Sequence, residues 1–533
     1  MDEKAGCSVN ARARFTPGPA RKRTARPLGF DRSPAPSWMK SFIIATAVTL
    51  AWAGSSFSQS LKEFEKKVTE FTLSNGLHFI IVERHDAPVV AFNSYANVGA
   101  VDDPSGKTGL AHMFEHMAFK GTANIGSSNW PLEKAAMQKI ENAYDELQNE
   151  QNKGVQADKA KIAQLQTRLR EEIEAADKFV IPNLYTEIIE ENGGEGLNAQ
   201  TAMDSTQFFY EFPSNRLELW FLLESERFYA PVFREFYKER SVVREERRMS
   251  VESNPQGQLS EALSATAFEA HPYHNPPVGW SSDIESFRLA DAIAFYKKYY
   301  VPSNLSIAIV GDVDPKEARR LADRYFAIIP AGPDPAPVHT VEPIQKGERE
   351  ATVTSPAQPV ELIGYKRPDE RSEDDAVLDV VTEILSSGRT GLIFKELVRD
   401  KQVALDAGAV PSIPGTKYPN LFLLYLVPNQ GKSLAECEKP LLSILERLKT
   451  QKIDDATLKR VKTKLRADLI ERLDSNAGLA SELNAYYWAY GDWRRLFTEL
   501  DEYDRVTADD VERVAGKYFI PEARTTVRLA EEK

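Results

Sequence analysis

Two stretches of the sequence, LADAIAFYKKYYVP at 289–302 and ADDVERVAGKYFIP at 508–521, align without a gap. Each has the pattern of an amphipathic helix, ends in two aromatic residues, a β-branched residue and a proline, and runs into a β-rich segment that we expect to form an edge strand. A helix and a strand that occur twice in this order indicate a duplicated α+β domain. Chance similarity between two amphipathic helices remains the alternative.

A polar, proline-rich stretch, PAGPDPAPVHTVEPIQKGE, begins at Pro330 and separates two segments with mixed helix and strand patterning. Such composition is typical of an interdomain linker. We therefore expect two α/β-sandwich domains, each with a mostly antiparallel sheet and helices packed on it. The predicted boundaries are 59–330 for the first domain, 331–348 for the linker and 349–533 for the second domain.

The first segment is the longer one, and its excess lies at 131–178. This stretch consists almost entirely of strong helix formers, with a break near Gly154 and apolar residues at helical spacing on both sides. We expect an antiparallel helical hairpin inserted in the first domain. Its charges are typical of a solvated face, and a role as partner contact or gate has no support in the sequence.

The composition excludes several classes of function. The chain has 533 residues, of which 42% are apolar and 27% charged, and its net charge is −12. This is a globular composition without the basic field that attracts nucleic acid or acidic lipid, so no nucleic-acid partner is expected.

The first 58 residues differ from the rest. MKSFIIATAVTLAWAGSSFSQS, from Met39, has a basic start, a short apolar run and small residues, which are the parts of a secretory signal with cleavage after Ala53 or Ser58. The run is too short to span a bilayer. We interpret 1–58 as a leader with its signal peptide at 39–58 and expect a bacterial periplasmic or secreted protein without a stable membrane span. An arginine-rich organelle transit peptide is the alternative. Removal of the leader leaves Cys437 as the last cysteine, so no internal disulfide is expected.

The stretch GLAHMFEH, 109–116, holds two of the seven histidines of the chain. It contains no helix breaker after Gly109 and follows a predicted strand pair around Asn75-Gly76. On a helix, His112 and His116 lie one turn apart on one face, so both imidazoles can bind one ion. The order H-x-x-E-H is the inverse of the H-E-x-x-H motif of zinc peptidases.

Two imidazoles suit Zn²⁺, and a catalytic zinc takes a third protein ligand and leaves a position for water. Zinc lowers the pKa of that water, and a nearby carboxylate can accept its proton. Glu115 is the candidate base. The third ligand must come from elsewhere, and FYKERSVVREERRMSVESNP offers Glu239 and Glu246, which lie two turns apart on one helix face. One of them can bind the metal while the other orients a ligand; read alone, this helix is typical of a salt-bridged surface.

Five stretches together resemble the insulinase/pitrilysin peptidase family, M16, with the two-domain subunits related to mitochondrial processing peptidase as the closest type. They are GLAHMFEHMAFKGT, GGEGLNAQTAMDSTQFFYEFP, ERSVVREE, HPYHNPPVGW and YYVPSNLSIAIVGDVDP. The resemblance implies a zinc endopeptidase with one zinc per chain. Its ligands are His112, His116 and Glu246, its base is Glu115, and Glu239 supports them.

The resemblance also implies that Asn198 and Ala199 lie on an edge strand that pairs with the substrate backbone. An ordinary turn and strand start is the alternative for these two residues. The second half has no H-x-x-E-H and so no metal site. Members of the family work as a clamshell of four such domains, so the chain is expected to form a homodimer or a heterodimer with a zinc-less sister subunit.

The leading functional hypothesis is a zinc metalloendopeptidase that acts on peptides or unfolded polypeptides. The alternatives are a non-catalytic scaffold subunit of a heterodimer and an organelle peptidase that processes presequences. His271 and His274 form a possible second metal pair, but the prolines around them indicate an irregular structural loop.

Overall fold

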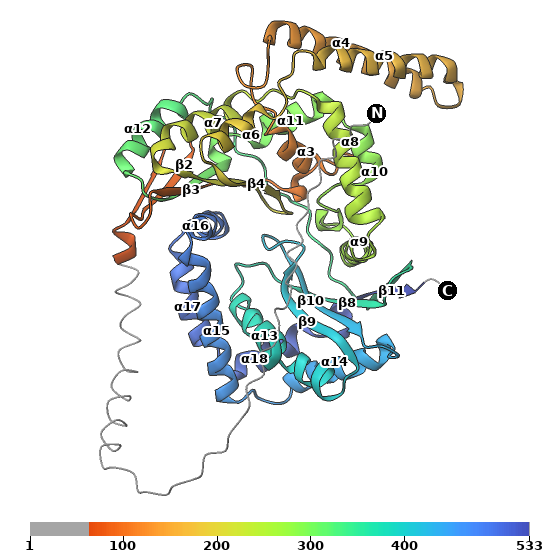
Figure 1. Ribbon diagram of the computed structural model, residues 1–533. Helices are drawn as coiled ribbons and strands as arrows, with labels where there is room; N and C mark the ends of the chain where they lie inside the picture. Colours follow the sequence, from red (N-terminus) through yellow and green to blue (C-terminus); the bar gives the residue numbers. More distant parts are fainter. Residues whose placement is uncertain (1–62, 532–533) are drawn as a thin grey trace, which may run out of the picture. The chain divides into compact units, whose positions relative to one another are not determined.

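The computed structural model describes residues 63–531, which form two β-sheets covered by helices (Figure 1). The strands of the six-stranded sheet are β1 (Val68–Thr72), β2 (His78–Glu83), β3 (Val89–Ala96), β4 (Glu195–Thr201), β5 (Thr206–Pro213) and β6 (Leu305–Gly311). Their order is β1-β2-β6-β3-β5-β4. The strands of the five-stranded sheet are β7 (Arg349–Ser355), β8 (Val360–Arg367), β9 (Ala404–Ile413), β10 (Asn420–Pro428) and β11 (Arg524–Glu531). Their order is β7-β11-β8-β10-β9.

The second sheet repeats five strands of the first in the same order and with the same directions. The pair β2 and β6 is parallel in the first sheet, as is the pair β7 and β11 in the second, and all other pairs are antiparallel. This confirms the α+β fold with mostly antiparallel sheets. It also confirms the hairpin at Asn75-Gly76, since β1 and β2 pair antiparallel across that turn.

Helices precede, cover and connect the strands. Those between β3 and β7 are α3 (Leu110–Met117), α4 (Trp130–Gln151), α5 (Lys159–Asp177), α6 (Leu184–Glu191), α7 (Leu217–Tyr229), α8 (Phe236–Arg247), α9 (Pro255–Ala267), α10 (Ser281–Ser286), α11 (Leu289–Tyr299) and α12 (Pro315–Tyr325). Those after β8 are α13 (Asp375–Ser386), α14 (Leu434–Leu448), α15 (Asp455–Asp474), α16 (Asn476–Tyr490), α17 (Arg495–Arg505) and α18 (Ala508–Tyr518).

The two aligned stretches form the same local structure. In each, a helix (α11 or α18) is followed by a 3₁₀ turn that starts at the shared proline and then by a strand (β6 or β11). The prediction that these strands lie at sheet edges is wrong, because both have a neighbouring strand on each side. β6 is buried at every position, because β2 and β3 pair with its two edges and α16 packs on it.

Two helices pack on the sheet of the other half. α9, from the first half, covers β7 and β11 with its buried residues Leu259, Leu263 and Ala267 (Figure 1). α16, from the second half, covers β3 and β6, where Asn484 donates hydrogen bonds to the backbone oxygen and the Oδ1 of Asn93. Each sheet therefore completes its covering with a helix from the other half.

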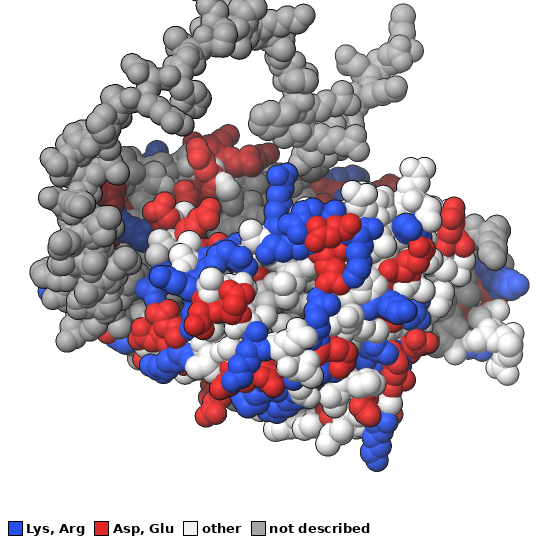
Figure 2. Space-filling model, turned by 90° about the horizontal axis from the view of Figure 1, so that it is seen from below, with Lys and Arg blue, Asp and Glu red and all other residues white. Residues whose placement is uncertain are grey.

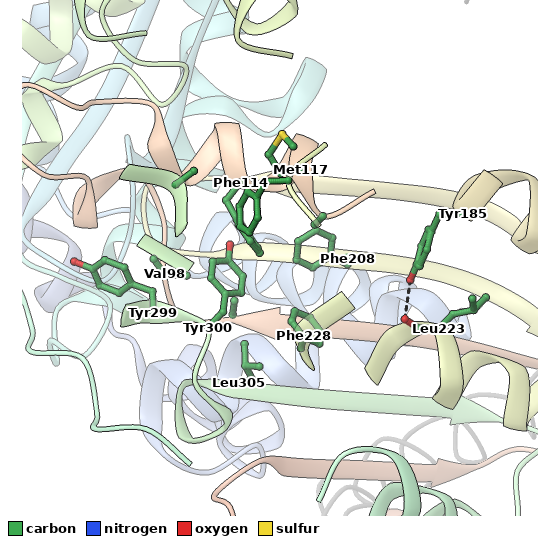
Figure 3. Close-up of a cluster of buried hydrophobic side chains, with 14 of the residues drawn as sticks. Val98, Phe114, Met117, Tyr185, Phe208, Leu223, Phe228, Tyr299, Tyr300 and Leu305 are labelled. Carbon is green, nitrogen blue, oxygen red and sulfur yellow. Dashed lines mark hydrogen bonds between the residues drawn. The ribbon is translucent and has the colours of Figure 1, made fainter. Parts of the chain in front are cut away.

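The core of the first half supports α3. Phe114 packs against Tyr300, from the end of the aligned stretch, with ring centroids 3.9 Å apart, and Met117 lies in the same cluster (Figure 3). Tyr185 lies at the far side of this cluster and donates a hydrogen bond to the Leu223 carbonyl (3.1 Å). The buried face of α3 thus fixes which face is directed away from the core.

Helices α4 and α5 occupy the segment in which we expected a hairpin and pack against each other (Figure 1). Tyr144 of α4 is buried against Tyr237 of α8 and accepts a hydrogen bond from Arg240 (2.8 Å). The segment 331–346 contains no helix or strand. The domain boundaries and the linker remain predictions.

The predicted leader and its signal peptide lie outside the described residues. Within 63–531, no helix has both the length and the apolar character that a bilayer span requires. On the face of the molecule seen in Figure 2, basic and acidic side chains are interspersed among uncharged ones.

Candidate metal centre

The first turn of α3 is fixed by contacts that involve its backbone. Gly109, which precedes the helix, has φ 92°, and a Cβ at this position would lie 2.5 Å from the Val278 carbonyl oxygen. Only glycine combines this conformation with so close an approach. Asp103 accepts hydrogen bonds from the amides of Gly109 (2.6 Å) and Ala111 (2.9 Å), and so satisfies free N–H groups of the first turn.

His112 and His116 lie side by side on α3, as the spacing predicts. Their ring centroids are 4.8 Å apart and the planes are nearly perpendicular, at 83°. Glu246 comes from the last turn of α8, and its Oε2 lies 3.6 Å from His112 Nε2 and 3.4 Å from His116 Nε2. The three donor atoms all lie within 4.8 Å of one another.

This donor set fits zinc. A tetrahedral zinc with bonds of about 2.0–2.1 Å separates neighbouring donor atoms by about 3.3 Å, close to the two distances to Glu246. Two imidazole nitrogens and one carboxylate oxygen are typical ligands of catalytic zinc and leave one position for water. Among the described residues, this is the one group of three or more histidine, cysteine or acidic side chains close enough to share an ion.

The electrostatics of the site also favour a cation. Burial lowers the pKa of His112 to about 4, so its imidazole is neutral and available as a ligand at pH 7. Burial acts in the same direction on His116, but Glu239 and Glu246 outweigh it and raise the pKa of His116 to about 9. Two carboxylates thus stabilise positive charge where the metal would bind.

Glu239 lies behind His116, on the same face of α8 as Glu246. Its Oε2 is 3.3 Å from His116 Nδ1, on the side of the ring opposite to Nε2. A carboxylate in this position holds a metal-binding histidine in the correct tautomer and orientation.

Glu115 joins the metal centre to the edge of the first sheet. Burial raises its pKa, and hydrogen bonds from the side chain and backbone of Thr201, in β4, partly offset that shift. The order of the sheet leaves one edge of β4 without a partner strand among the described residues. Glu115 therefore contacts a free strand edge one residue away from a predicted metal ligand.

The direction of the free backbone groups follows from the hairpin between β4 and β5. The Ala202 amide donates to the Ser205 carbonyl (2.8 Å), and hydrogen-bonded pairs alternate with non-bonded ones from there along an antiparallel pair. Ala199, three residues away, accordingly belongs to a non-bonded pair, and its N–H and C=O are directed away from β5. The Ala199 amide instead donates to the side chain of the exposed Asn198 (2.9 Å).

A cavity of about 290 Å³ opens beside the metal centre. Its lining includes Glu115, His116 and Glu239 together with the segment 180–186 that follows the helical hairpin. All of its lining residues belong to the first half of the chain, between residues 115 and 239.

Not every candidate joins the site. His271 Nδ1 accepts a hydrogen bond from the Tyr273 amide (3.2 Å), and neither His271 nor His274 belongs to a potential metal group within 63–531. Two residues of the site were missed by the sequence analysis. Thr201 gives no local signal, and Lys120, which forms an ion pair with Glu239, lies within the quoted GLAHMFEHMAFKGT stretch but beyond the helix.

Two family models match the chain. The model described as insulinase (peptidase family M16) matches residues 79–165 and 178–279, and the model described as peptidase M16 inactive domain matches residues 286–465. Together they cover both halves, and the predicted metal ligands fall within the first.

Curated relatives and solved structures agree with the family models. The zinc protease PqqE of Helicobacter pylori is 27% identical over 501 residues, which are 92% of this chain and 98% of the relative. A crystal structure of a protease from Helicobacter pylori has a TM-score of 0.72 at 27% identity and covers 87% of this chain and 99% of that one. The periplasmic protease PqqL of Escherichia coli shares the fold, with a TM-score of 0.64 at 16% identity, over 87% of this chain and 47% of that one.

Proposed function

The chain belongs to the insulinase peptidase family, M16, and on this premise we propose that it is a zinc metalloendopeptidase that hydrolyses peptide bonds in peptides or unfolded polypeptides. The observation that carries the proposal is the position of Glu115. It lies between a histidine of the candidate zinc site and the free edge of β4, where an extended peptide can add as a strand.

Each residue has a separate task in this proposal. His112, His116 and Glu246 hold one zinc ion per chain. The zinc, when bound, acts as a Lewis acid and brings the pKa of water toward neutrality. Glu115 takes a proton from the attacking water and passes it to the departing amine. Glu239 keeps the His116 ring oriented.

The substrate backbone is held by β4. The amide and carbonyl of Ala199 are directed away from β5, so they can pair with a peptide in extended conformation. The Oδ1 of Asn198 accepts the hydrogen bond of the Ala199 amide in the free protein, so an incoming peptide would have to replace it as the acceptor. Because main-chain pairing carries no side-chain information, such an edge accepts many sequences.

Among the described residues of the second half, none lines the cavity beside the candidate metal centre. This supports the proposal that a further copy of the chain, or a zinc-less sister subunit, closes the site from the opposite side. Light scattering of the purified protein, alone and with candidate sister subunits, measures this. A monomer with full peptidase activity would contradict it.

We also propose export to the periplasm. The signal-like segment at 39–58 supports it, as does the likeness of fold to a protein described as a periplasmic protease. Mass spectrometry of the mature N-terminus is the test: a start at Gly54 or Gln59 supports export, and a start elsewhere supports an organelle transit peptide or no cleavage.

The central experiment is metal analysis combined with cleavage of a mixed peptide pool. One zinc per chain and hydrolysis that a chelator abolishes and zinc restores are the expected results. Protein that holds no zinc and cleaves nothing, alone or with a partner subunit, would instead support the non-catalytic scaffold.

A further inference from the structure

Lys120 lies four residues after His116, just beyond the end of α3, and its side chain returns toward the metal centre. Its Nζ is 2.5 Å from Glu239 Oε1 and 3.1 Å from Glu235 Oε2. The side chains of Lys120 and Glu239 are only 17% and 16% exposed. The ion pair is therefore largely shielded from water. A shielded charge pair is stronger than one at the surface.

Glu239 uses its two oxygens for different partners. Oε2 faces His116 Nδ1 at 3.3 Å, and Oε1 faces Lys120. With Oε1 held by an ammonium group, Oε2 is left to receive the imidazole N–H. The carboxylate cannot turn away without breaking the ion pair, so Lys120 acts on the His116 ring through Glu239.

Lys120 is itself held in place from the backbone. The guanidinium of the buried Arg234 donates to the carbonyl oxygens of Lys120, Thr122 (2.6 Å) and Ile125 (2.8 Å). Glu133, at the start of α4, accepts a hydrogen bond from the same guanidinium (2.7 Å). Glu133, at the start of the helical hairpin, thus helps Arg234 to fix the loop that places Lys120 beside Glu239.

His112 has no comparable support. Its Nδ1 is buried and has no hydrogen-bond partner among residues 63–531. The outer support of the candidate zinc site is therefore concentrated on the side of His116, and the line from Lys120 through Glu239 carries it.

We propose that Lys120 is a positioning residue that fixes Glu239, and through it His116, in the orientation that zinc binding requires. This inference rests on the proposed zinc site and adds to it a residue that is not one of the three predicted metal ligands. Loss of a partner of this outer kind typically weakens metal binding by about 10- to 100-fold. For Lys120, one contact further out, we expect the lower end of that range.

The test is the zinc dissociation constant, measured by competition with a chelator of known affinity, for four single variants and one double variant. Lys120→Met removes the ammonium group and is expected to weaken binding by about tenfold. Lys120→Arg retains a cation within reach of Glu239 and should restore most of the affinity. Lys238→Met is the matched control, because the side chain of Lys238 pairs with Glu235 and Asp177 and forms no ion pair with Glu239 within 63–531. It should bind zinc as the wild type does.

The fourth variant, Glu239→Gln, separates positioning from a general effect on folding. If Lys120 acts through Glu239, Lys120→Met should cost less than about twofold in affinity once Glu239→Gln is present. Equal losses in both backgrounds, or wild-type affinity of Lys120→Met, would overturn the inference while the zinc site stands. Wild-type protein that binds no zinc would overturn the proposed function as well. Circular dichroism of the metal-free variants shows that each is folded.

Discussion

Substitution of Glu115 by glutamine is the sharpest test of the proposed chemistry. Glutamine has the size of glutamate and can keep the contact to Thr201, but it cannot accept a proton from water. Glu115 is not one of the three donor groups that share the metal position, so zinc content should stay at one ion per chain. Because the base is removed and the metal is kept, peptide hydrolysis should fall by about 10²–10⁴-fold, which corresponds to about 3–5 kcal/mol of activation free energy.

Stability gives a second readout for the same variant. Burial raises the pKa of Glu115, which means that the fold disfavours its charged form. An uncharged glutamine removes that cost, so metal-free Glu115→Gln should melt at the same temperature as the metal-free wild type or above it. A large loss of stability would show that the side chain has a different environment from the one described.

The assay follows cleavage of a fluorogenic peptide pool at saturating zinc, together with zinc analysis of each preparation. Glu245→Gln is the matched control, since Glu245 neighbours Glu246 but is exposed and paired with Arg248. It should be fully active. Hydrolysis at the wild-type rate in Glu115→Gln, with zinc bound, would refute the role of Glu115 as base; loss of zinc in that variant would refute the separation of base from ligands.

Three further predictions concern the strand edge and the second half. Ala199→Pro removes the outward amide at an edge position that proline tolerates, and it should lower kcat/KM for peptides by about tenfold with zinc retained; unchanged kinetics would contradict pairing of the substrate at β4. Burial raises the pKa of Glu499 to about 7, so the folded state holds this proton more tightly than the unfolded state does. The stability that the neutral carboxyl gives the folded protein is present at pH 4 and is lost as the pH rises through 7. Glu499→Gln should therefore lose up to about 3 kcal/mol less stability than the wild type between pH 5 and 8 in urea titrations, and parallel pH profiles would contradict this. Asp204 accepts hydrogen bonds from Tyr273 (2.7 Å) and from the Thr416 amide (2.8 Å) of the other half, so Asp204→Ala should lower the free energy of unfolding by about 2–4 kcal/mol; a change below about 0.5 kcal/mol would contradict it.

The sequence predicts the parts of the site that depend on short-range geometry. The spacing of His112 and His116 was enough to predict that they are neighbours, because a helix places residues four apart on one face. Glu246 lies 130 residues after His116, and helical spacing alone left it equal to Glu239; the family resemblance distinguished them. The structure separates them physically, with Glu246 at the Nε2 atoms and Glu239 behind one ring.

Longer-range features could not be predicted. Neither α9 nor α16 has a strong apolar stripe in its sequence, so no pattern shows which sheet they cover. Lys120 is a flexible side chain beyond the end of a helix, and no periodicity signals that it returns toward Glu239. The interior position of β6 was within reach, since LSIAIVG is an almost continuous apolar run of the kind found in strands with neighbours on both sides.

The exchange of α9 and α16 makes each half the completion of the other. Each half expressed separately would expose the sheet face that the missing helix covers, and its own exchanged helix would have no sheet to pack on. We therefore expect such fragments to aggregate rather than fold. For the same reason the intact chain should unfold in one cooperative step, and a protease cut in the 331–346 segment should leave the two pieces associated until denaturant is added.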